Sequence, residues 1–480
     1  MTLGLDSYRS SATSARRREG SPSLLVLLWA VLALPLGLAA PRPGALFSEH
    51  AVLQRGKPVP IWGESAPGEA IAVEYREVSA RTVADATGHW RAVLPAMAAA
   101  GPATLTVRGT STVAIHDVAV GDVWLVAGQS NLEWPLAKTV GAAEAIAAAN
   151  LPWLRHLKVP YRVAEVPTRD LGARWVVSSP ATAGDFSAVA FHFVRQLYRD
   201  DSVPVGLLNA SRGGSVIEAW LGPPALAATP HTVLEGAQPA DARPSGLYHG
   251  MLHPLLPAAL RGVVWYQGES NVLRPAEYVG LLKSLITGWR ADFADSELPF
   301  LVVQLPNYAD GKFSWWQLRA AQAQAVAEVA RAHLAVTIDL GEARDKHPRD
   351  KAEVGRRLAL LARRHVFGEA VVAESPRVRA AWRREGAAVV EFETSPGGLV
   401  VRTAAASGPT WEVAGEDGRF VSAEARVEGD RVVVAAAAVP QPRTVRYLGH
   451  NNPVPRLFSP EGLPVAPFQC AVTNRPEPLR

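Results

Sequence analysis

Cysteine is nearly absent from this sequence, since Cys470 is the only one among 480 residues. A single cysteine excludes an intrachain disulfide and any metal site built from several thiolates. The sequence also lacks a large excess of either charge, because it has 49 Lys and Arg and 45 Asp and Glu, which gives a formal net charge of +4. The basic residues form no stripe of the kind that binds nucleic acid, so we expect no nucleic-acid partner.

Long apolar runs are also missing after residue 40. A bilayer-spanning helix needs roughly 18 or more apolar residues, and the run at 24–40 is interrupted by Pro35 and Gly37. Three arginines at 16–18 precede this run, and small residues end it at Ala40. The pattern predicts a signal peptide over 1–40 and an exported protein, periplasmic or extracellular, without stable membrane insertion after cleavage. A single N-terminal anchor helix is the alternative.

The rest of the sequence has an ordinary globular composition, with 48% hydrophobic and 20% charged residues. Three regions follow from the patterns. Short alternating runs predict an N-terminal β-sandwich module over 41–120 and a C-terminal β module over 369–480. Between them, at 121–368, apolar runs alternate with helix-period stretches, which indicates an α/β domain with a mostly parallel sheet. Its expected strands are 123–127, 205–208, 262–266, 300–305 and 335–338, and its expected helices are 188–198, 276–289, 316–332 and 351–365.

Polar side chains follow the ends of these strands, where ligands bind in open α/β sheets. Ser130 follows the first strand and is either a nucleophile or only a helix cap. A glycine of the pair at 213–214 and the side chain of Gln267 follow the next two strands and offer N–H groups to an oxyanion, with a plain turn and a capping segment as the alternatives. Asp345 and His347 follow the last strand, so that the aspartate can orient the imidazole as a base. Each signal is weak alone, but together they form the parts needed for acyl transfer.

Four segments carry a resemblance to a known family. They are GDVWLVAGQSNLEWPL at 121–136, NASRGGSVIEAWL at 209–221, RGVVWYQGESN at 261–271 and DKHPRDKAEVGRRLA at 345–359. The sequence resembles the sialate O-acetylesterase family of the SGNH hydrolase superfamily. The resemblance extends to 46–63 and 451–468, and so covers nearly the whole chain after residue 40.

The resemblance implies a three-layer α/β/α hydrolase domain with accessory β-sandwich modules. It places the nucleophile on Ser130 and the base on His347. The oxyanion hole is expected from the Ser130 and Gly214 amides and the Gln267 side chain. No metal and no organic cofactor is expected in this chemistry.

The sequence leaves the acid of the triad open. Asp345 is favoured because it lies two residues from His347, so that little chain entropy is lost in closing the contact. Glu269 is the other candidate, and it otherwise shapes the site by bonding to Asn131 or to a substrate hydroxyl.

The expected function is that of a secreted serine esterase that removes O-acetyl groups from carbohydrates. Sialic acid and acetylated plant polysaccharides such as xylan are the candidate substrates, and xylan-type substrates are slightly favoured. The alternative is a catalytically inactive carbohydrate-binding protein, for which two β modules and 14 tryptophans would be suitable.

Overall fold

The computed structural model describes residues 40–197, 203–232, 239–309, 314–402 and 410–476. The predicted signal peptide lies outside the described residues except for Ala40. Within the described ranges, no helix is both long enough and apolar enough to cross a membrane.

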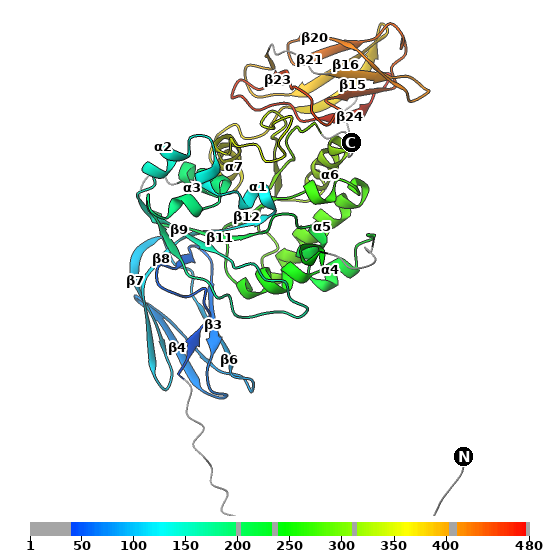
Figure 1. Cartoon of the computed structure of the whole chain (residues 1–480). Helices are drawn as coiled ribbons and strands as arrows, with labels where there is room; N and C mark the ends of the chain where they lie inside the picture. Colours follow the sequence, from blue (N-terminus) through cyan, green and yellow to red (C-terminus); the bar gives the residue numbers. More distant parts are fainter. Residues whose placement is uncertain (1–39, 198–202, 233–238, 310–313, 403–409, 477–480) are drawn as a thin grey trace, which may run out of the picture. The chain divides into compact units, whose positions relative to one another are not determined.

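A large mixed sheet forms the centre of the fold (Figure 1). Its main path has the strand order β10-β9-β11-β8-β12-β13-β14, and every neighbouring pair is parallel except β10 with β9. All residues of β11, β12 and β13 are buried, as expected for parallel strands covered on both faces. The strands are β8 (Thr112–Gly128), β9 (Leu151–Lys158), β10 (Val176–Ser178), β11 (Val205–Ser211), β12 (Gly262–Tyr266), β13 (Phe300–Val303) and β14 (Ala332–Ala335).

Helices cover both faces of this sheet. Trp265 pairs in register with Ala127, three residues along β8 from Trp124, so the two tryptophans point to opposite faces. Trp124 contacts Phe193 of α3, and Trp265 contacts Trp289 of α5. The helices are α1 (Ser130–Glu133), α2 (Ala142–Ala147), α3 (Ala188–Leu197), α4 (Pro223–Ala227), α5 (Pro275–Asp292), α6 (Trp315–Ala327) and α7 (Ala352–His365).

Four strands of the N-terminal region, β2, β4, β5 and β7, join the same sheet through β8, whereas β1, β3 and β6 form a separate three-stranded sheet. The first half of β8 pairs with β7 and β2, and its second half pairs with β11 and β12. The domain boundary expected between 120 and 121 therefore falls inside one continuous strand of 17 residues. The other strands of this region are β1 (Arg42–Pro43), β2 (Val52–Gln54), β3 (Val59–Glu64), β4 (Ala70–Tyr75), β5 (Val78–Val83), β6 (His89–Leu94) and β7 (Ala100–Arg108).

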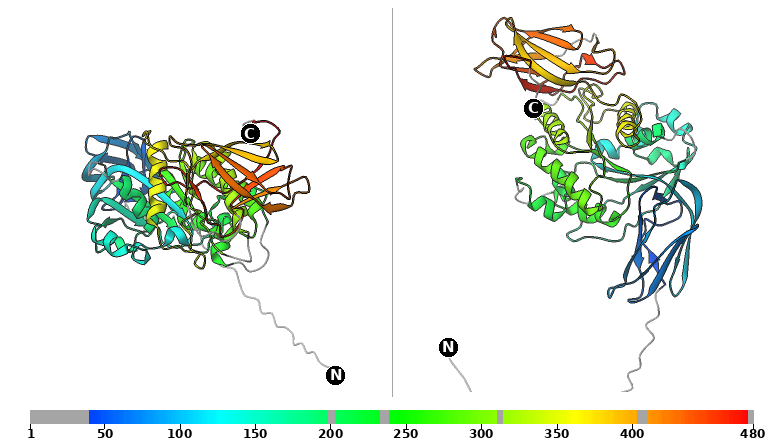
Figure 2. Two further views of the ribbon diagram at one scale, coloured as in Figure 1. Left: turned by 90° about the horizontal axis from the view of Figure 1, so that it is seen from above. Right: turned by 180° about the vertical axis from the view of Figure 1, so that it is seen from behind.

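The C-terminal strands, coloured from yellow to red, form two four-stranded sheets and a two-stranded ribbon (Figure 2). The four-stranded sheets share one apolar core, to which Val390, Trp411 and Tyr447 contribute. The strands are β15 (Arg377–Arg384), β16 (Ala387–Glu393), β17 (Val400–Val401), β18 (Trp411–Ala414), β19 (Phe420–Ser422), β20 (Glu424–Glu428), β21 (Arg431–Ala435), β22 (Thr444–Tyr447), β23 (Leu457–Phe458) and β24 (Phe468–Ala471).

The predicted α/β class is confirmed as a mixed α/β fold with a large mixed sheet. Three strands of the main path differ from the prediction. The last one, β14, covers 332–335 rather than 335–338, and β9 at 151–158 and β10 at 176–178 were not expected.

Candidate active site

The central strand β8 marks the place where ligands are expected to bind. The chain lays down β11 on one side of β8 and then crosses to the other side to form β12. In open α/β sheets, ligands bind beyond the carboxyl ends of the strands at such a switch point. The carboxyl end of β8 is Gly128, two residues before Ser130.

The backbone before Ser130 is fixed by a close approach to β12. Gly128 has φ +145°, and a Cβ on it would lie 2.1 Å from the Tyr266 carbonyl oxygen. Gln129 donates its N–H to the same carbonyl at 2.9 Å. Ser130 then opens the one-turn helix α1, so its own N–H has no partner within the helix.

The structure brings Ser130 and His347 together from opposite ends of the domain sequence. The Ser130 hydroxyl oxygen lies 2.9 Å from His347 Nε2, which is hydrogen-bonding distance. Trp134 stacks on the imidazole, with ring centroids 4.9 Å apart and an interplanar angle of 18°. This contact restricts rotation of the His347 ring, and therefore keeps Nε2 directed at the hydroxyl.

Asp345 holds the loop that carries His347. Its carboxylate accepts the His347 backbone N–H at 2.8 Å and lies 3.6 Å from the ring atom Nδ1. Of the two acids considered from the sequence, Asp345 is the one that the structure places beside Nδ1. At 3.6 Å, Asp345 Oδ1 and His347 Nδ1 are within ion-pair distance but are too far apart for a hydrogen bond.

The electrostatic surroundings favour a neutral imidazole. Partial burial lowers the pKa of His347, and the positive charges of Lys346 and Lys351 lower it further, while Asp345 acts in the opposite direction. A neutral imidazole is the form that accepts a proton from a hydroxyl.

Glu269 contacts Asn131 instead of the histidine. Asn131 is fully buried, and its amide donates to Glu269 Oε1 at 2.5 Å and to the Lys346 carbonyl at 2.9 Å. Lys351, also fully buried, donates its ammonium to Asn131 Oδ1 at 2.6 Å. Asn131 thus ties the loop of His347 to the end of β12.

Both ends of this network carry perturbed groups. Burial raises the pKa of Glu269, and burial lowers the pKa of Lys351 to about 8. The opposite charges of the two residues act against these shifts, so Lys351 and Glu269 stabilise each other's ionised form across Asn131.

Gln267 does not point its amide toward the nucleophile. The side chain is fully buried, and its two N–H groups go to the Ser215 carbonyl at 3.1 Å and to Asn271 Oδ1 at 2.7 Å. The Tyr278 hydroxyl donates to its oxygen at 2.8 Å. Internal acceptors use both amide protons in this arrangement, so the role of Gln267 as an oxyanion donor stays a prediction that these contacts do not favour.

The glycine pair after β11 lies against Ser130. A Cβ on Gly213 would be 3.3 Å from that of Ser130, and the Gly213 N–H donates to Glu133 Oε2 at 2.7 Å. Gly214 has φ +78° and open space around its Cβ position. No acceptor for the Gly214 N–H is recorded among the described residues, so this amide remains available to a ligand.

Sequence reasoning missed three residues of this site, which are Glu133, Trp134 and Lys351. Glu133 lies three positions after Ser130, a spacing that places two side chains on the same side of a helical turn. Lys351 ends the polar stretch that follows His347, and nothing in that stretch showed that its ammonium would be buried.

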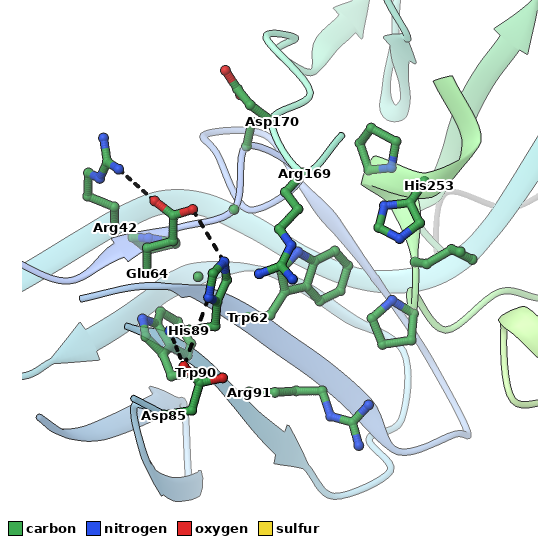
Figure 3. A pocket seen from close by; sticks show the side chains of 17 residues that line it. Arg42, Trp62, Glu64, Asp85, His89, Trp90, Arg91, Arg169, Asp170 and His253 are labelled. Carbon is green, nitrogen blue, oxygen red and sulfur yellow. Dashed lines mark hydrogen bonds and ion pairs between the residues drawn. The ribbon is translucent and has the colours of Figure 1, made fainter. Parts of the chain in front are cut away.

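A cavity of about 540 Å³ lies elsewhere in the molecule (Figure 3). Trp62, Arg169 and His253 are among its lining residues, and an ion-pair chain links Arg42, Glu64 and His89. None of its lining residues belongs to the Ser130 site. Side-chain geometry, rather than cavity size, therefore identifies the candidate active site.

Comparisons with known proteins agree with this geometry. Residues 120–363 match the model of the carbohydrate esterase, sialic acid-specific acetylesterase family. The sialate O-acetylesterases of Homo sapiens and Pongo abelii are each 32% identical to this chain over 393 residues, which cover 72% of this chain and 74% of each relative. The chain belongs to the sialic acid-specific acetylesterase family.

A crystal structure extends the similarity to most of the chain. A carbohydrate acetylesterase from Xanthomonas citri is 41% identical, with a TM-score of 0.83, and the alignment covers 90% of this chain and 99% of that one. The family resemblance stated from the sequence motifs is thus confirmed. As a member of the sialic acid-specific acetylesterase family, the protein is a carboxylic ester hydrolase.

Proposed function

We propose that this esterase removes O-acetyl groups from carbohydrates through an acetyl-enzyme formed on Ser130. The observation that carries the proposal is the 2.9 Å contact between the Ser130 hydroxyl and His347 Nε2 at the switch point of the sheet. A nucleophile within hydrogen-bonding distance of an oriented base is the arrangement that acyl transfer needs.

In the first half-reaction, Ser130 Oγ attacks the carbonyl carbon of the acetyl group, and its proton moves to His347 Nε2. The carbonyl oxygen becomes an oxyanion, which the backbone N–H groups of Ser130 and Gly214 stabilise. The C–O bond to the sugar then breaks. The departing sugar oxygen takes the proton from Nε2, which leaves the sugar alcohol and an acetyl group on Ser130.

In the second half-reaction, water attacks the acetyl carbon while His347 Nε2 takes one of its protons. Collapse of this intermediate returns the proton to Ser130 Oγ and releases acetic acid. Asp345 is proposed as the acid of the triad, because its carboxylate lies 3.6 Å from Nδ1 and stabilises the imidazolium that forms in each half-reaction.

We also propose a finer fold assignment. The domain at 121–368 is placed among the three-layer SGNH hydrolases, with sandwich-type modules at 41–120 and 369–480. Helices on both sheet faces and the shared core of the two C-terminal sheets support this assignment. The arginines and apolar run before Ala40 support export to the periplasm or the cell exterior.

The inactive carbohydrate-binding alternative is not favoured. A module that only binds sugar has no need for a serine within hydrogen-bonding distance of a histidine, and the chain belongs to an acetylesterase family.

The substrate class is proposed as an O-acetylated polysaccharide of the acetyl-xylan type, with O-acetylated sialic acid as the second candidate. The Xanthomonas citri relative, at 41% identity, is described as a carbohydrate acetylesterase, and this broader name supports a range beyond sialic acid. The relatives at 32% identity are sialate O-acetylesterases, and for this reason O-acetylated sialic acid is the second candidate substrate.

Acetate release from acetyl-xylan and from O-acetylated sialic acid tests both substrates in one experiment. Ser130→Ala should lower turnover by about 10⁶-fold with the protein still folded. Ser395→Ala is the matched control, because the Ser395 hydroxyl donates to the exposed Glu461, far along the sequence from the Ser130 site. Activity of Ser130→Ala within tenfold of the native enzyme would place the nucleophile elsewhere.

A further inference from the structure

Two histidines and a glutamate meet in a place unrelated to the esterase site. His333 lies on β14, His365 is the last residue of α7, and Glu374 lies in the segment between α7 and β15. One ligand atom from each of them falls within 4.8 Å of the other two. His365 Nε2 contacts Glu374 Oε1, and the two imidazole rings stack with centroids 3.6 Å apart.

We propose that His333, His365 and Glu374 bind one divalent transition-metal ion, with zinc as the preferred occupant. Two imidazole nitrogens and one carboxylate oxygen form a ligand set that suits zinc, usually at metal–ligand distances of about 2.0–2.2 Å. Neighbouring ligands of a tetrahedral ion at these distances lie about 3.4 Å apart. The three ligand atoms therefore need shifts on the order of 1 Å, which side-chain rotation provides by opening the stacked rings.

The backbone supports this arrangement. α7 packs against β13 and β14, so the elements that carry the two histidines are already in contact. The side chains are half-buried, with 24% of His365 and 31% of Glu374 exposed, which leaves a path for an ion to enter.

The three residues line a cavity of about 480 Å³. Its remaining wall is largely apolar and includes Val326 of α6 and Phe468 of β24. A zinc ion held by three protein ligands on one wall keeps a fourth position for water on the cavity side. Arg331 and Arg377 add positive charge near His333, but both are largely exposed, so solvent and salt screen their repulsion.

A bound ion would link β14 and α7 of the esterase region to the segment at Glu374 that leads into the C-terminal sheets; we call this linkage the metal clasp. Binding would hold Glu374 against β14 and α7, and so would stabilise the folded chain in proportion to metal concentration. The clasp shares no residue with the Ser130 site, so metal removal should leave turnover unchanged while it lowers the melting temperature. This inference does not depend on the proposed substrate.

The test uses the full mature chain without a histidine tag, freed of metal by chelation and titrated with Zn²⁺ by calorimetry. We expect one equivalent to bind and the melting temperature to rise with Zn²⁺. Glu374→Gln and His333→Gln should each weaken binding by more than the roughly 10–100-fold that loss of an outer partner costs. His116→Gln is the matched control and should bind as the native chain does, because His116 is exposed, hydrogen-bonds to Thr104 and is not one of the three proposed ligands.

Hydrolysis of p-nitrophenyl acetate by each variant shows whether it is folded, because none of the changed residues belongs to the esterase site. The proposal fails if the native chain binds no zinc. It also fails if folded Glu374→Gln and His333→Gln bind zinc as tightly as His116→Gln does.

Discussion

Asp345 acts on His347 through two contacts of different kinds. One carboxylate oxygen accepts the backbone N–H at 2.8 Å and lies 3.6 Å from Nδ1 of the ring. The first contact sets the loop, and the second stabilises positive charge on the imidazole. Glu269 contributes to the same site indirectly, because its carboxylate holds Asn131, which in turn holds the Lys346 carbonyl.

This difference in role predicts the relative damage of two conservative changes. Asp345→Asn keeps an acceptor for the loop N–H but removes the charge beside Nδ1, and should lower kcat by up to about 10⁴-fold. Glu269→Gln keeps the size of the side chain and should cost roughly tenfold to a hundredfold. Both are measured as kcat and KM on the same acetate ester. A larger loss of kcat in Glu269→Gln would transfer the role of the acid to Glu269.

The lowered pKa of His347 predicts how activity depends on pH. The imidazole must be neutral to accept the serine proton, so kcat/KM should fall as the pH drops through its pKa, below the ordinary value of about 6.5. The Lys346 charge disfavours the imidazolium, so Lys346→Gln should raise this pKa and move the acid limb to higher pH. The shift should shrink at high salt, because Lys346 is exposed.

Lys283→Gln is the control for that profile, because Lys283 pairs with Glu328 in another part of the surface. An acid limb that does not move in Lys346→Gln would mean that another group sets it.

At the scale of elements, the strands and helices with strong patterns were predictable from the sequence. The α5 range was expected within three residues at either end, because Pro275 opens it and its apolar period is regular. β9 was missed because Arg155 and His156 interrupt its apolar run. Arg155 is nevertheless buried, and its guanidinium bonds to Asp117 and to backbone carbonyls, which the sequence does not reveal.

The error at β14 has a related cause. Val336 and Ile338 read as part of a sheet strand, but both pack into the core of the C-terminal sheets. An apolar run shows that residues are buried, and does not show which core buries them. The surroundings of Gln267 were hidden from the sequence in the same way, because the pattern cannot show that Ser215 and Asn271 accept its amide protons.

The turn between β8 and α1 gives a prediction at this scale. Gly128→Ala should destabilise the protein by at least about 1–3 kcal/mol from its backbone conformation alone. The total loss of unfolding free energy should exceed this figure, because the added Cβ would lie only 2.1 Å from the Tyr266 carbonyl oxygen. Gly141→Ala is the matched control, with φ +71° and nothing within 4 Å of the added carbon.

Urea unfolding measures both changes. The folded fraction of Gly128→Ala should also lose turnover, since the shift in backbone displaces Ser130, whereas Gly141→Ala should keep it. Equal stability losses in the two variants would contradict the close approach between β8 and β12.

At the scale of the whole described molecule, cores and sequence regions do not coincide. Residues 336 and 338, from the connection between β14 and α7, contribute to the C-terminal core. Buried Arg319 of α6 donates to the carbonyls of His450 and Asn451, from the C-terminal region. Burial lowers the pKa of Arg319 to about 9, and the peptide carbonyls around it compensate part of its lost hydration.

The continuity of β8 has a consequence for amide hydrogen exchange. Its first half completes the ladder with β7 and β2, and its second half completes the ladder with β11 and β12. When one half of β8 separates from its partners, the other half loses the strand continuity that supports its own hydrogen bonds. The amides of both halves should therefore exchange through one cooperative opening. Mass spectrometry of peptides covering 112–120 and 122–128 should therefore give the same opening free energy. A clearly lower value for 112–120 would show that the N-terminal strands unfold on their own and leave the support of Ser130 intact.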